Sequence, residues 1–436
     1  MLTRSAILVA AVALVAPAAL GDDWPQWMGP KRDNVWRETG IVDKFPKGGP
    51  KVLWRAPVNA GYSGPAVVGG KVFVTDRVLA KGAKNPDNPF DTKNSIAGTE
   101  RVLCLDAKSG NELWKHEYPC GYQISYNSGP RCTPLVSDGK VYALGAMGDL
   151  LCLDAEKGKV LWSVDFKEKY GAKPAIWGYA AHPVLDGKKL ITLAGGEGAH
   201  VVALDKDTGK EIWKAHTDKD IGYAPPLFTE VGGKRQMIVA APKSVYALDP
   251  DTGKELWSTP YSADNTSIIM TPIRVGDYLF VAGYRTKNLM LKLTAGKPEV
   301  LFKDKKGFAF SPVNVQPFAD GEVVYGYDEG GTMYGIEVPS GKRLWDDNGP
   351  IGKNPQGSET AFITKNGDRF FFFAETGDLV IGKLTPKGYE EIDRAKVLDP
   401  TGAAFGRKVV WCAPAYADKK AFVRNDKELI CIDLAK

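Results

Sequence analysis

Ala203-Leu-Asp-Lys-Asp-Thr-Gly-Lys-Glu-Ile-Trp213 returns almost unchanged as Ala247-Leu-Asp-Pro-Asp-Thr-Gly-Lys-Glu-Leu-Trp257. Each copy contains a short apolar run, an Asp, a turn centred on Gly, and a final apolar residue followed by Trp. Further copies end at Trp114, Trp162 and Trp345, and weaker ones end at Phe302 and near Ile392. The copies recur at about the length of a four-stranded propeller blade. The repeat therefore predicts a β-propeller.

The residues before each copy supply the other strands of a blade. In Thr133-Pro-Leu-Val-Ser-Asp-Gly-Lys-Val-Tyr142, two apolar runs flank an Asp-Gly pair. Gly adopts a positive φ without a steric clash, so Asp-Gly between apolar runs indicates a hairpin. In the repeated turn, we expect Asp205 to accept backbone N–H groups and Gly209 to be left-handed. Each unit is thus predicted to contain four strands.

The outer strands of the predicted blades number eight, and they carry Trp54, Trp114, Trp162, Trp213, Trp257, Phe302, Trp345 and Ile392. The last segment, residues 413–433, has only three strands before the chain ends. The unpaired strand at residues 52–55 is expected to complete that blade, which closes the ring and removes its open edges. We predict an all-β, eight-bladed propeller whose last blade is closed by the N-terminal strand.

The N-terminus has the pattern of a secretory signal peptide. Arg4 precedes an apolar run over residues 6–16, and the small-residue site Ala19-Leu20-Gly21 follows. The alternative, an uncleaved anchor helix, is disfavoured because the run is shorter than the ~20 residues that span a bilayer. We expect cleavage of residues 1–21 near Gly21, an N-terminal extension over 22–50 and a propeller over 51–436. The mature protein would then be periplasmic or extracellular, with no transmembrane segment.

The charge pattern disfavours nucleic acid as a partner. The chain has 57 Lys and Arg against 52 Asp and Glu, and the two signs are interspersed along it. A nucleic-acid surface would instead show a basic patch or stripe. No linker or charge block divides the repeats, so we expect one ring, and we expect it to be a monomer.

The six cysteines fall into two groups. Cys104, Cys152 and Cys431 occupy the position held by Ala or Gly in other blades, so we expect small buried thiols there. Cys120 and Cys132 flank the loop between the first two blades, where a bridge would contribute roughly 2–4 kcal/mol. Because export permits disulfides, we predict that bridge. Cys412 is the leftover thiol or the alternative partner.

The repeat resembles the tryptophan-docking repeat of the pyrroloquinoline-quinone (PQQ) dehydrogenase propellers. Asp23-Trp-Pro-Gln-Trp-Met-Gly-Pro-Lys-Arg-Asp-Asn34 is similar to the opening of many secreted PQQ-like repeat proteins. The same propeller is used by BamB proteins, which assemble outer-membrane β-barrels. The likeness covers nearly the whole mature chain, but it resides in residues that hold blades together. The docking residues Trp54, Trp114, Trp162, Trp213, Trp257 and Trp345 are accordingly interpreted as structural.

The sequence has only part of the pattern that the resemblance implies for a PQQ-dependent dehydrogenase. The PQQ alcohol dehydrogenases carry an adjacent Cys-Cys disulfide against the cofactor, and this sequence has no such pair. They also use a Glu, Asn and Asp set to hold Ca²⁺ and abstract a proton. The candidates Glu359, Asn314 and Asp328 lie in separate blades with no motif that links them. No His or Cys spacing typical of a metal site occurs either. We expect no metal and no cofactor, with PQQ and Ca²⁺ as the alternative.

Long segments are predicted on one face of the propeller, at residues 76–100, 119–131, 166–182, 346–359 and 394–411. Loops on a rigid scaffold are common binding sites, and aromatic residues with Arg favour interface cores. Positions just before the inner strands should also meet at the channel mouth on this face, where they bind a ligand or line a water-filled channel. The candidate binding residues are Tyr62, Tyr126, Arg131, Trp177, Tyr179, His182, Tyr223, Asn314, Glu359 and Trp411.

Three functions remain open from the sequence. The leading hypothesis is an exported, non-catalytic scaffold that binds a protein or extracellular polymer through the long-loop face. The second is a reduced PQQ-dependent dehydrogenase that uses the channel mouth. The third is a BamB-like role in outer-membrane protein assembly.

Overall fold

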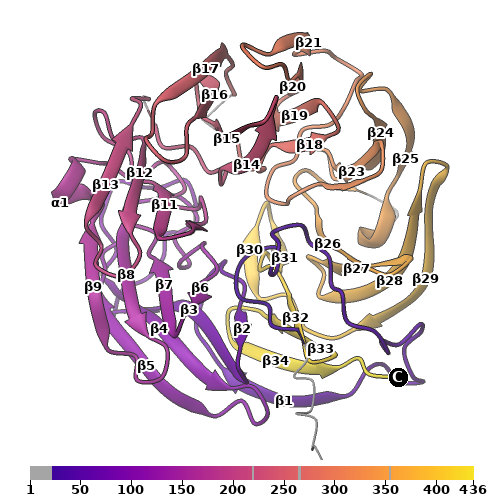
Figure 1. The fold of residues 1–436 in the computed structure, drawn as a ribbon. Coiled ribbons are helices and arrows are strands. Elements are labelled where there is room, and N and C mark those ends of the chain that lie inside the picture. The colour runs from indigo at the N-terminus through magenta and orange to yellow at the C-terminus, as the bar shows by residue number, and fades with distance from the viewer. Residues whose placement is uncertain (1–21, 219, 264–266, 353–354) are drawn as a thin grey trace, which may run out of the picture.

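Antiparallel sheets arranged around a central channel form the body of the molecule (Figure 1). The computed structural model describes residues 22–218, 220–263, 267–352 and 355–436. Within these residues, eight four-stranded sheets form the ring and one two-stranded sheet stands apart. The predicted eight-bladed propeller is confirmed. The segment predicted as a signal peptide, residues 1–21, lies outside the described residues.

The blades follow one another along the chain, each with its strands in order from the channel outward. Blade 1 is β2 (Ala66–Val68), β3 (Lys71–Leu79), β4 (Gly98–Asp106) and β5 (Glu112–Pro119). Blade 2 is β6 (Leu135–Ser137), β7 (Lys140–Leu144), β8 (Asp149–Asp154) and β9 (Val160–Asp165). Blade 3 is β10 (Val184–Asp186), β11 (Lys189–Leu193), β12 (Val201–Asp205) and β13 (Glu211–Ala215). Blade 4 is β14 (Leu227–Val231), β15 (Lys234–Ala240), β16 (Ser244–Leu248) and β17 (Glu255–Pro260).

The second half of the ring repeats this order. Blade 5 is β18 (Ile273–Val275), β19 (Tyr278–Gly283), β20 (Lys287–Lys292) and β21 (Glu299–Lys303). Blade 6 is β22 (Phe318–Asp320), β23 (Val323–Tyr327), β24 (Met333–Glu337) and β25 (Arg343–Asp347). Blade 7 is β26 (Ala361–Asn366), β27 (Arg369–Ala374), β28 (Asp378–Thr385) and β29 (Gly388–Lys396). Blade 8 contains β32 (Ala415–Ala417), β33 (Lys420–Arg424) and β34 (Glu428–Asp433). Short elements outside the blades are α1 (Phe166–Tyr170), the 3₁₀ helix η2 (Gly349–Ile351) and the hairpin β30 (Gly402–Ala404) and β31 (Arg407–Val409).

The ring closes with the strand that the sequence predicted. β1 (Val52–Pro57) pairs antiparallel with β34, with Trp54 opposite Cys431. The two ends of the chain therefore share blade 8, and β34 has no free edge (Figure 1). Blade 8 is therefore four-stranded like the other seven blades.

Four of the docking Trp residues tie their blade to the next one by the same two contacts. The ring of Trp162 in blade 2 lies against Gly209 of blade 3, where an added Cβ would come within 2.7 Å of the ring. Its Nε1 donates to the Lys206 carbonyl at 3.1 Å. Trp54, Trp114 and Trp213 repeat both contacts on the following blade. Trp257 differs, because blade 5 lacks the Asp turn and Trp257 donates to Gln236 of its own blade instead.

The register of the blades explains the small residue in the repeat. Cys104, Cys152 and Cys431 lie directly opposite Trp114, Trp162 and Trp54 on the neighbouring strand. Ala203, Ala247 and Gly335 lie opposite the Trp of their blades in the same way. At Gly335, a Cβ would lie 2.6 Å from Trp345 Nε1. The indole therefore selects a small partner, and a thiol is one of the side chains that fit.

The predicted disulfide between Cys120 and Cys132 is not formed. Both residues are buried free thiols, as are the other four cysteines. The Cys120 sulfur faces Asp149 Oδ2 at 3.9 Å, whereas the Cys132 sulfur faces the Tyr179 carbonyl at 3.8 Å. The two side chains thus pack into different clusters, one under the loop and one between blades 2 and 3.

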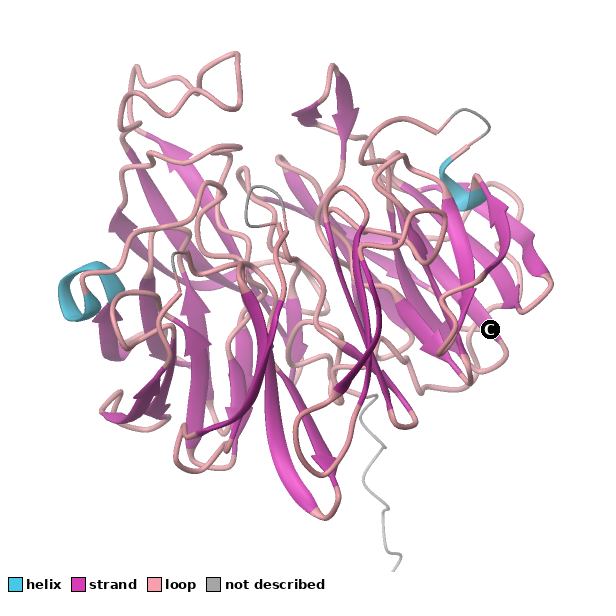
Figure 2. Cartoon of the chain, turned by 90° about the horizontal axis from the view of Figure 1, so that it is seen from above, coloured by secondary structure: helices cyan, strands magenta, loops and turns pink. Residues whose placement is uncertain are grey.

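The two faces of the propeller differ. Long loops and the β30–β31 hairpin rise from one face, which we call the long-loop face, while short turns join the strands on the other (Figure 2). The predicted loop over residues 76–100 is shorter than expected, because β3 extends to Leu79 and β4 begins at Gly98. The N-terminal extension runs beneath the opposite face and hydrogen-bonds to blades 1, 2, 4, 7 and 8. In the described residues, no helix has both the length and the apolarity to cross a membrane.

Candidate functional site

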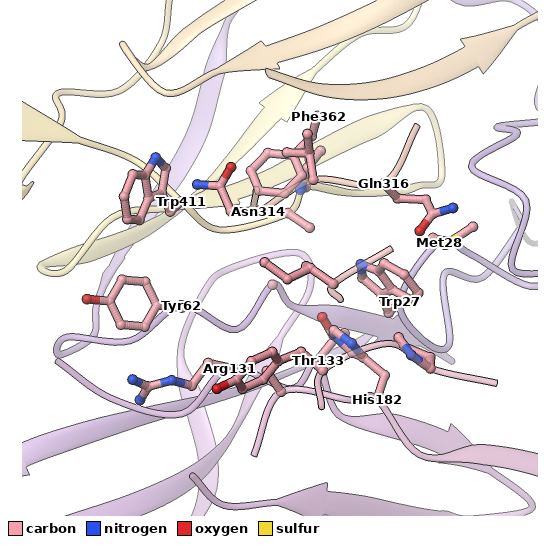
Figure 3. Close-up of a pocket in the computed structure, with 18 of the residues that line it drawn as sticks. Trp27, Met28, Tyr62, Arg131, Thr133, His182, Asn314, Gln316, Phe362 and Trp411 are labelled. Carbon is pink, nitrogen blue, oxygen red and sulfur yellow. The ribbon is translucent and has the colours of Figure 1, made fainter. Parts of the chain in front are cut away.

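A cavity of about 240 Å³ occupies the channel on the long-loop side of the propeller (Figure 3). Residues that precede the inner strands of seven blades contribute to its wall, as the sequence predicted for this position, and in blade 7 the inner strand β26 itself contributes. The wall includes Tyr62, Arg131, His182, Tyr223, Ile269, Asn314, Phe362 and Trp411. No Asp or Glu is among the described residues that line it. The cavity is therefore apolar and aromatic, with a few polar groups at separate points.

Aromatic rings form the entrance. We call this group the aromatic mouth; it consists of Tyr62, Phe90, Tyr126, Trp177, Phe405 and Trp411. Tyr126 is its centre, with ring centroids 5.3 Å from Phe90, 5.9 Å from Trp411 and 6.2 Å from Phe405. These separations fall in the range of favourable aromatic pairs. Phe90 and Phe405 remain 48% and 53% exposed, so the mouth presents apolar surface to solvent.

The β30–β31 hairpin carries Phe405 and is anchored by one buried carboxylate. Glu375, at the end of β27, accepts from Arg407 Nε at 2.6 Å and from Trp411 Nε1 at 2.8 Å. The Val410 amide also donates to the Glu375 carbonyl at 2.8 Å. Charge-assisted bonds of this kind are roughly twice as strong as neutral ones. Glu375 thereby fixes one side of the mouth to blade 7.

A second buried carboxylate holds the opposite side. Glu100 on β4 accepts from the hydroxyls of Tyr118 and Tyr122 and from the Ala146 amide at 3.0 Å. Arg77 lies over the Tyr122 ring at 3.9 Å and donates to the Asn127 carbonyl at 2.8 Å. The loop over residues 80–97 is linked to the mouth because the Tyr126 amide donates to the Pro89 carbonyl at 2.9 Å. Phe90 is thus positioned by a buried polar network.

Arg131 combines a structural role with two unused N–H donors. Its Nη2 donates to the carbonyls of Ser125 at 2.9 Å and Tyr126 at 2.6 Å, and its Nη1 donates to that of Gly129. The guanidinium also lies over the Tyr62 ring at 5.1 Å. Burial raises the pKa of Tyr62 to about 12, so its hydroxyl stays protonated beside Arg131. Arg131 therefore brings a positive charge to the mouth while it fixes the loop.

The deeper polar groups are His182, Asn314 and Gln316. Both ends of the Gln316 amide are engaged, since Oε1 accepts from the Thr271 amide at 2.8 Å and Nε2 donates to the Thr271 carbonyl at 3.1 Å. Asn314 Nδ2 and His182 Nδ1 are buried without a hydrogen-bond partner among the described residues. Desolvation and then the charge of Arg32 lower the pKa of His182 to about 3. His182 is consequently neutral at physiological pH.

The N-terminal extension forms the floor of the cavity, which sequence reasoning missed. We define the floor as Trp24, Trp27 and Met28, all of which line the cavity. The Trp27 ring stacks on His182 with centroids 4.5 Å apart. Figure 3 shows Trp27 and Met28 at one end of the pocket and Tyr62, Arg131 and Trp411 at the other. The Asp23–Asn34 motif was visible in the sequence, but no repeat signal placed it in the channel.

Two predicted binding residues do not reach the cavity. Tyr179 is 2% exposed, and its hydroxyl donates to the Ala194 carbonyl at 2.7 Å, so it fills the space between blades 2 and 3. Glu359 accepts from the Gln356 amide at 2.6 Å within its own turn and is not part of the lining. The other eight candidates line the cavity. Among them, Trp177 and Tyr223 form a tilted ring pair at 5.4 Å.

The cofactor set that the resemblance implies does not fit these residues. Ca²⁺ prefers several oxygen ligands that include carboxylates, and no described carboxylate lines the cavity. Of the three candidates, only Asn314 is in the lining, whereas Asp328 pairs with Arg343 at 3.0 Å. No described group of three or more His, Cys, Asp or Glu side chains is arranged to hold a metal ion. The geometry thus offers no step through a quinone and Ca²⁺.

Comparison with known families agrees with this fold. The family model described as outer membrane protein assembly factor BamB, a set of PQQ-like repeats, matches residues 98–345 and 243–436. These ranges cover well over half of the chain. The chain belongs to the PQQ-like β-propeller repeat family. No curated protein sequence matches it.

Solved structures of this PQQ-like propeller family are similar across most of the chain. BamB from Moraxella catarrhalis is 15% identical with a TM-score of 0.53, over 87% of this chain and 96% of that chain. A quinohemoprotein alcohol dehydrogenase from Comamonas testosteroni is 15% identical with a TM-score of 0.57, over 95% of this chain and 80% of that chain. Another quinohemoprotein alcohol dehydrogenase, from Pseudomonas putida HK5, is 14% identical with a TM-score of 0.60, over 95% of this chain and 80% of that chain. At these identities the likeness establishes the fold alone.

Proposed function

We propose that this PQQ-like propeller is an exported, non-catalytic protein that binds a protein or extracellular polymer chain at its long-loop face. The aromatic mouth carries the proposal. Its exposed rings, Phe90 and Phe405, come from two loops that buried carboxylates fix in place. Exposed apolar surface on a rigid scaffold is typical of interaction sites, and aromatic residues dominate binding energy there.

The chemistry of the cavity favours binding over the dehydrogenase alternative. A proton-abstracting carboxylate would have to reach the substrate, and Glu359 and Asp328 are engaged in turns away from the cavity. His182 is stacked on Trp27 and has a pKa far below the range useful to a base at neutral pH. The groups that remain, namely aromatic rings, amides and Arg131, recognise ligands by shape and hydrogen bonding.

The match to the BamB model favours a second candidate, a role in outer-membrane protein assembly. Both candidates use the propeller as a protein-binding scaffold, and they differ in the partner. Under the second, the partner belongs to the assembly machinery or is an outer-membrane protein in transit.

The experiment compares two faces of the same protein. A Phe90→Ala, Phe405→Asn double variant removes the exposed rings, and a Leu113→Ala, Leu256→Ala variant removes exposed apolar residues from outer strands. Each is cross-linked to an extract of exported proteins, and the captured proteins are identified by mass spectrometry. We expect the first variant to lose the partners of the native protein and the second to keep them. Equal capture by all three would refute the long-loop face as the binding surface.

The enzyme alternative is tested separately. Absorbance and calorimetric titrations with PQQ and Ca²⁺ are expected to show no saturable binding below millimolar concentrations. Tight binding accompanied by alcohol-dependent reduction of a dye would overturn the non-catalytic proposal.

A further inference from the structure

The cavity is closed at its inner end. Trp24, Trp27 and Met28 form its floor, and the extension that carries them is hydrogen-bonded across the channel. The Trp24 amide donates to the Val67 carbonyl, the Val136 amide donates to the Pro25 carbonyl, and Arg32 donates to the Pro226 carbonyl at 3.2 Å. A chain that enters from the long-loop face therefore cannot pass through the propeller. Only the end of a chain, or a small molecule, fits.

The charge of the cavity selects the chemistry of that end. The lining contains Arg131, and no Asp or Glu is among its described residues. A guanidinium has five N–H donors. The hydrogen bonds of Arg131 to Gly129, Ser125 and Tyr126 use three of them, so the Nε–H and a second Nη1–H are left for an incoming group. These two N–H groups lie on different edges of the guanidinium, because the Nε–H shares its edge with Nη2. A carboxylate at Arg131 therefore accepts one charge-assisted hydrogen bond and is attracted by the positive charge.

The interior selects an apolar group. Below Arg131, the apolar part of the wall consists of Ile269, Val313, Val315, Phe362 and Met28, and the three deeper polar groups described above interrupt it. At about 240 Å³ the cavity is smaller than the ~300–1,000 Å³ typical of sites that enclose a whole drug-sized ligand. It thus encloses one large side chain at a time. Burial of such a side chain contributes roughly 1.5–3 kcal/mol.

We propose that the cavity binds the C-terminus of a polypeptide whose last side chain is large and apolar. The terminal carboxylate lies at Arg131, the last side chain enters the cavity above the floor, and the preceding residues cross Phe90 and Phe405. This inference rests on the proposed function and names the part of the partner that the site recognises. Phe90 and Phe405 supply the apolar surface that a single residue in the cavity leaves uncovered.

The test uses fluorescently labelled decapeptides that end in Phe, with either a free carboxylate or an amide. In fluorescence anisotropy, we expect the amide to bind the native protein at least ten-fold more weakly. Arg131→Gln should abolish the preference for the acid peptide. Because Arg131 also holds its loop through Gly129, Ser125 and Tyr126, both affinities fall while their ratio approaches one. Arg55→Gln, on the exposed outer strand β1, is the matched control and should bind both peptides as the native protein does. A peptide that ends in Ser should lose binding to every variant.

Each other outcome contradicts a defined part of the proposal. Equal affinity for acid and amide peptides on the native protein would overturn the carboxylate site, whatever the folding of Arg131→Gln. Competition by 3-phenylpropanoate as effective as that by the peptide would show a site for small aromatic acids and not for a chain end. If the Phe90 and Phe405 variant loses captured partners while acid and amide peptides bind alike, the binding function stands and this inference fails.

Discussion

At the scale of single residues, the docking indoles stabilise the contacts between successive blades. Trp162 fills the space above Gly209 and donates to the Lys206 carbonyl. We expect Trp162→Ala to lower the free energy of unfolding by about 3–5 kcal/mol. Trp162→Phe should lower it through altered packing and by about 1 kcal/mol more, because the hydrogen bond to the Lys206 carbonyl is lost. The adjacent Leu161 is 45% exposed, so Leu161→Ala should change the free energy of unfolding by under ~0.5 kcal/mol. Urea unfolding measures all three, and equal losses at Trp162 and Leu161 would contradict the docking role.

The imidazole of His182, whose Nδ1 atom is buried, makes stability depend on pH. Its pKa is about 3 in the folded protein and 6.5 in the unfolded chain, so acidification protonates the unfolded state first. The stabilising contribution is complete above pH 6.5 and is lost as the pH falls towards 3, at up to ~1.4 kcal/mol per pH unit. His182→Gln should therefore flatten the decline in unfolding free energy below pH 6. Above pH 7 the two urea-unfolding profiles should run parallel, and parallel profiles at every pH would refute a buried neutral His182.

Sequence reasoning was most accurate for residues whose roles repeat. The docking Trp positions and the small residue opposite each one follow from local spacing, because the same pair of residues packs together in successive blades. Tyr179 and Glu359 were misplaced because a side chain near a loop end can point into the ring or between blades, and spacing does not distinguish these. Arg131 was identified, but its carbonyl partners depend on the path of its loop.

At the scale of elements, the position of the β30–β31 hairpin should depend on the charge of the single residue Glu375. Glu375→Gln removes the charge that holds Arg407 while it keeps a similar shape at Trp411. We expect the hairpin to open more often, so trypsin should cleave after Arg407 and Lys408 several-fold faster while the other cleavage rates stay unchanged. Glu391→Gln, in an exposed pair with Arg394 on β29, is the control and should leave these rates as in the native protein. Unchanged cleavage in Glu375→Gln would show that backbone contacts alone hold the hairpin.

The elements of the blades were predictable because each one forms within a single repeat. The hairpin and the floor were not. The strands β30 and β31 span three residues each, which is too short for an alternating pattern to appear. The floor lies in a segment without repeats, and its position is set by contacts with blades far along the chain, such as the hydrogen bond from Trp36 to Lys365.

At the scale of the whole molecule, the N-terminal 36 described residues perform two separable tasks. Residues 22–50 close the channel, and β1 closes the ring. Trp36 packs on Tyr416 at 4.9 Å, so the extension also covers part of blade 8. One truncation that starts at Lys51 and another that starts at Val58 distinguish these tasks.

Loss of the extension and loss of β1 should therefore have different consequences. The protein that starts at Lys51 keeps β1 paired with β34, so we expect one cooperative unfolding transition at a lower denaturant midpoint. Its cavity lacks a floor, and its affinity for the peptide that ends in Phe should fall. The protein that starts at Val58 exposes the edge of β34, which favours edge-to-edge association. We expect it to lose cooperative unfolding and to aggregate in light scattering at concentrations where the first truncation is monomeric. If both truncations unfold alike, the ring does not depend on β1 for closure; if the first keeps full peptide affinity, the floor does not shape the site.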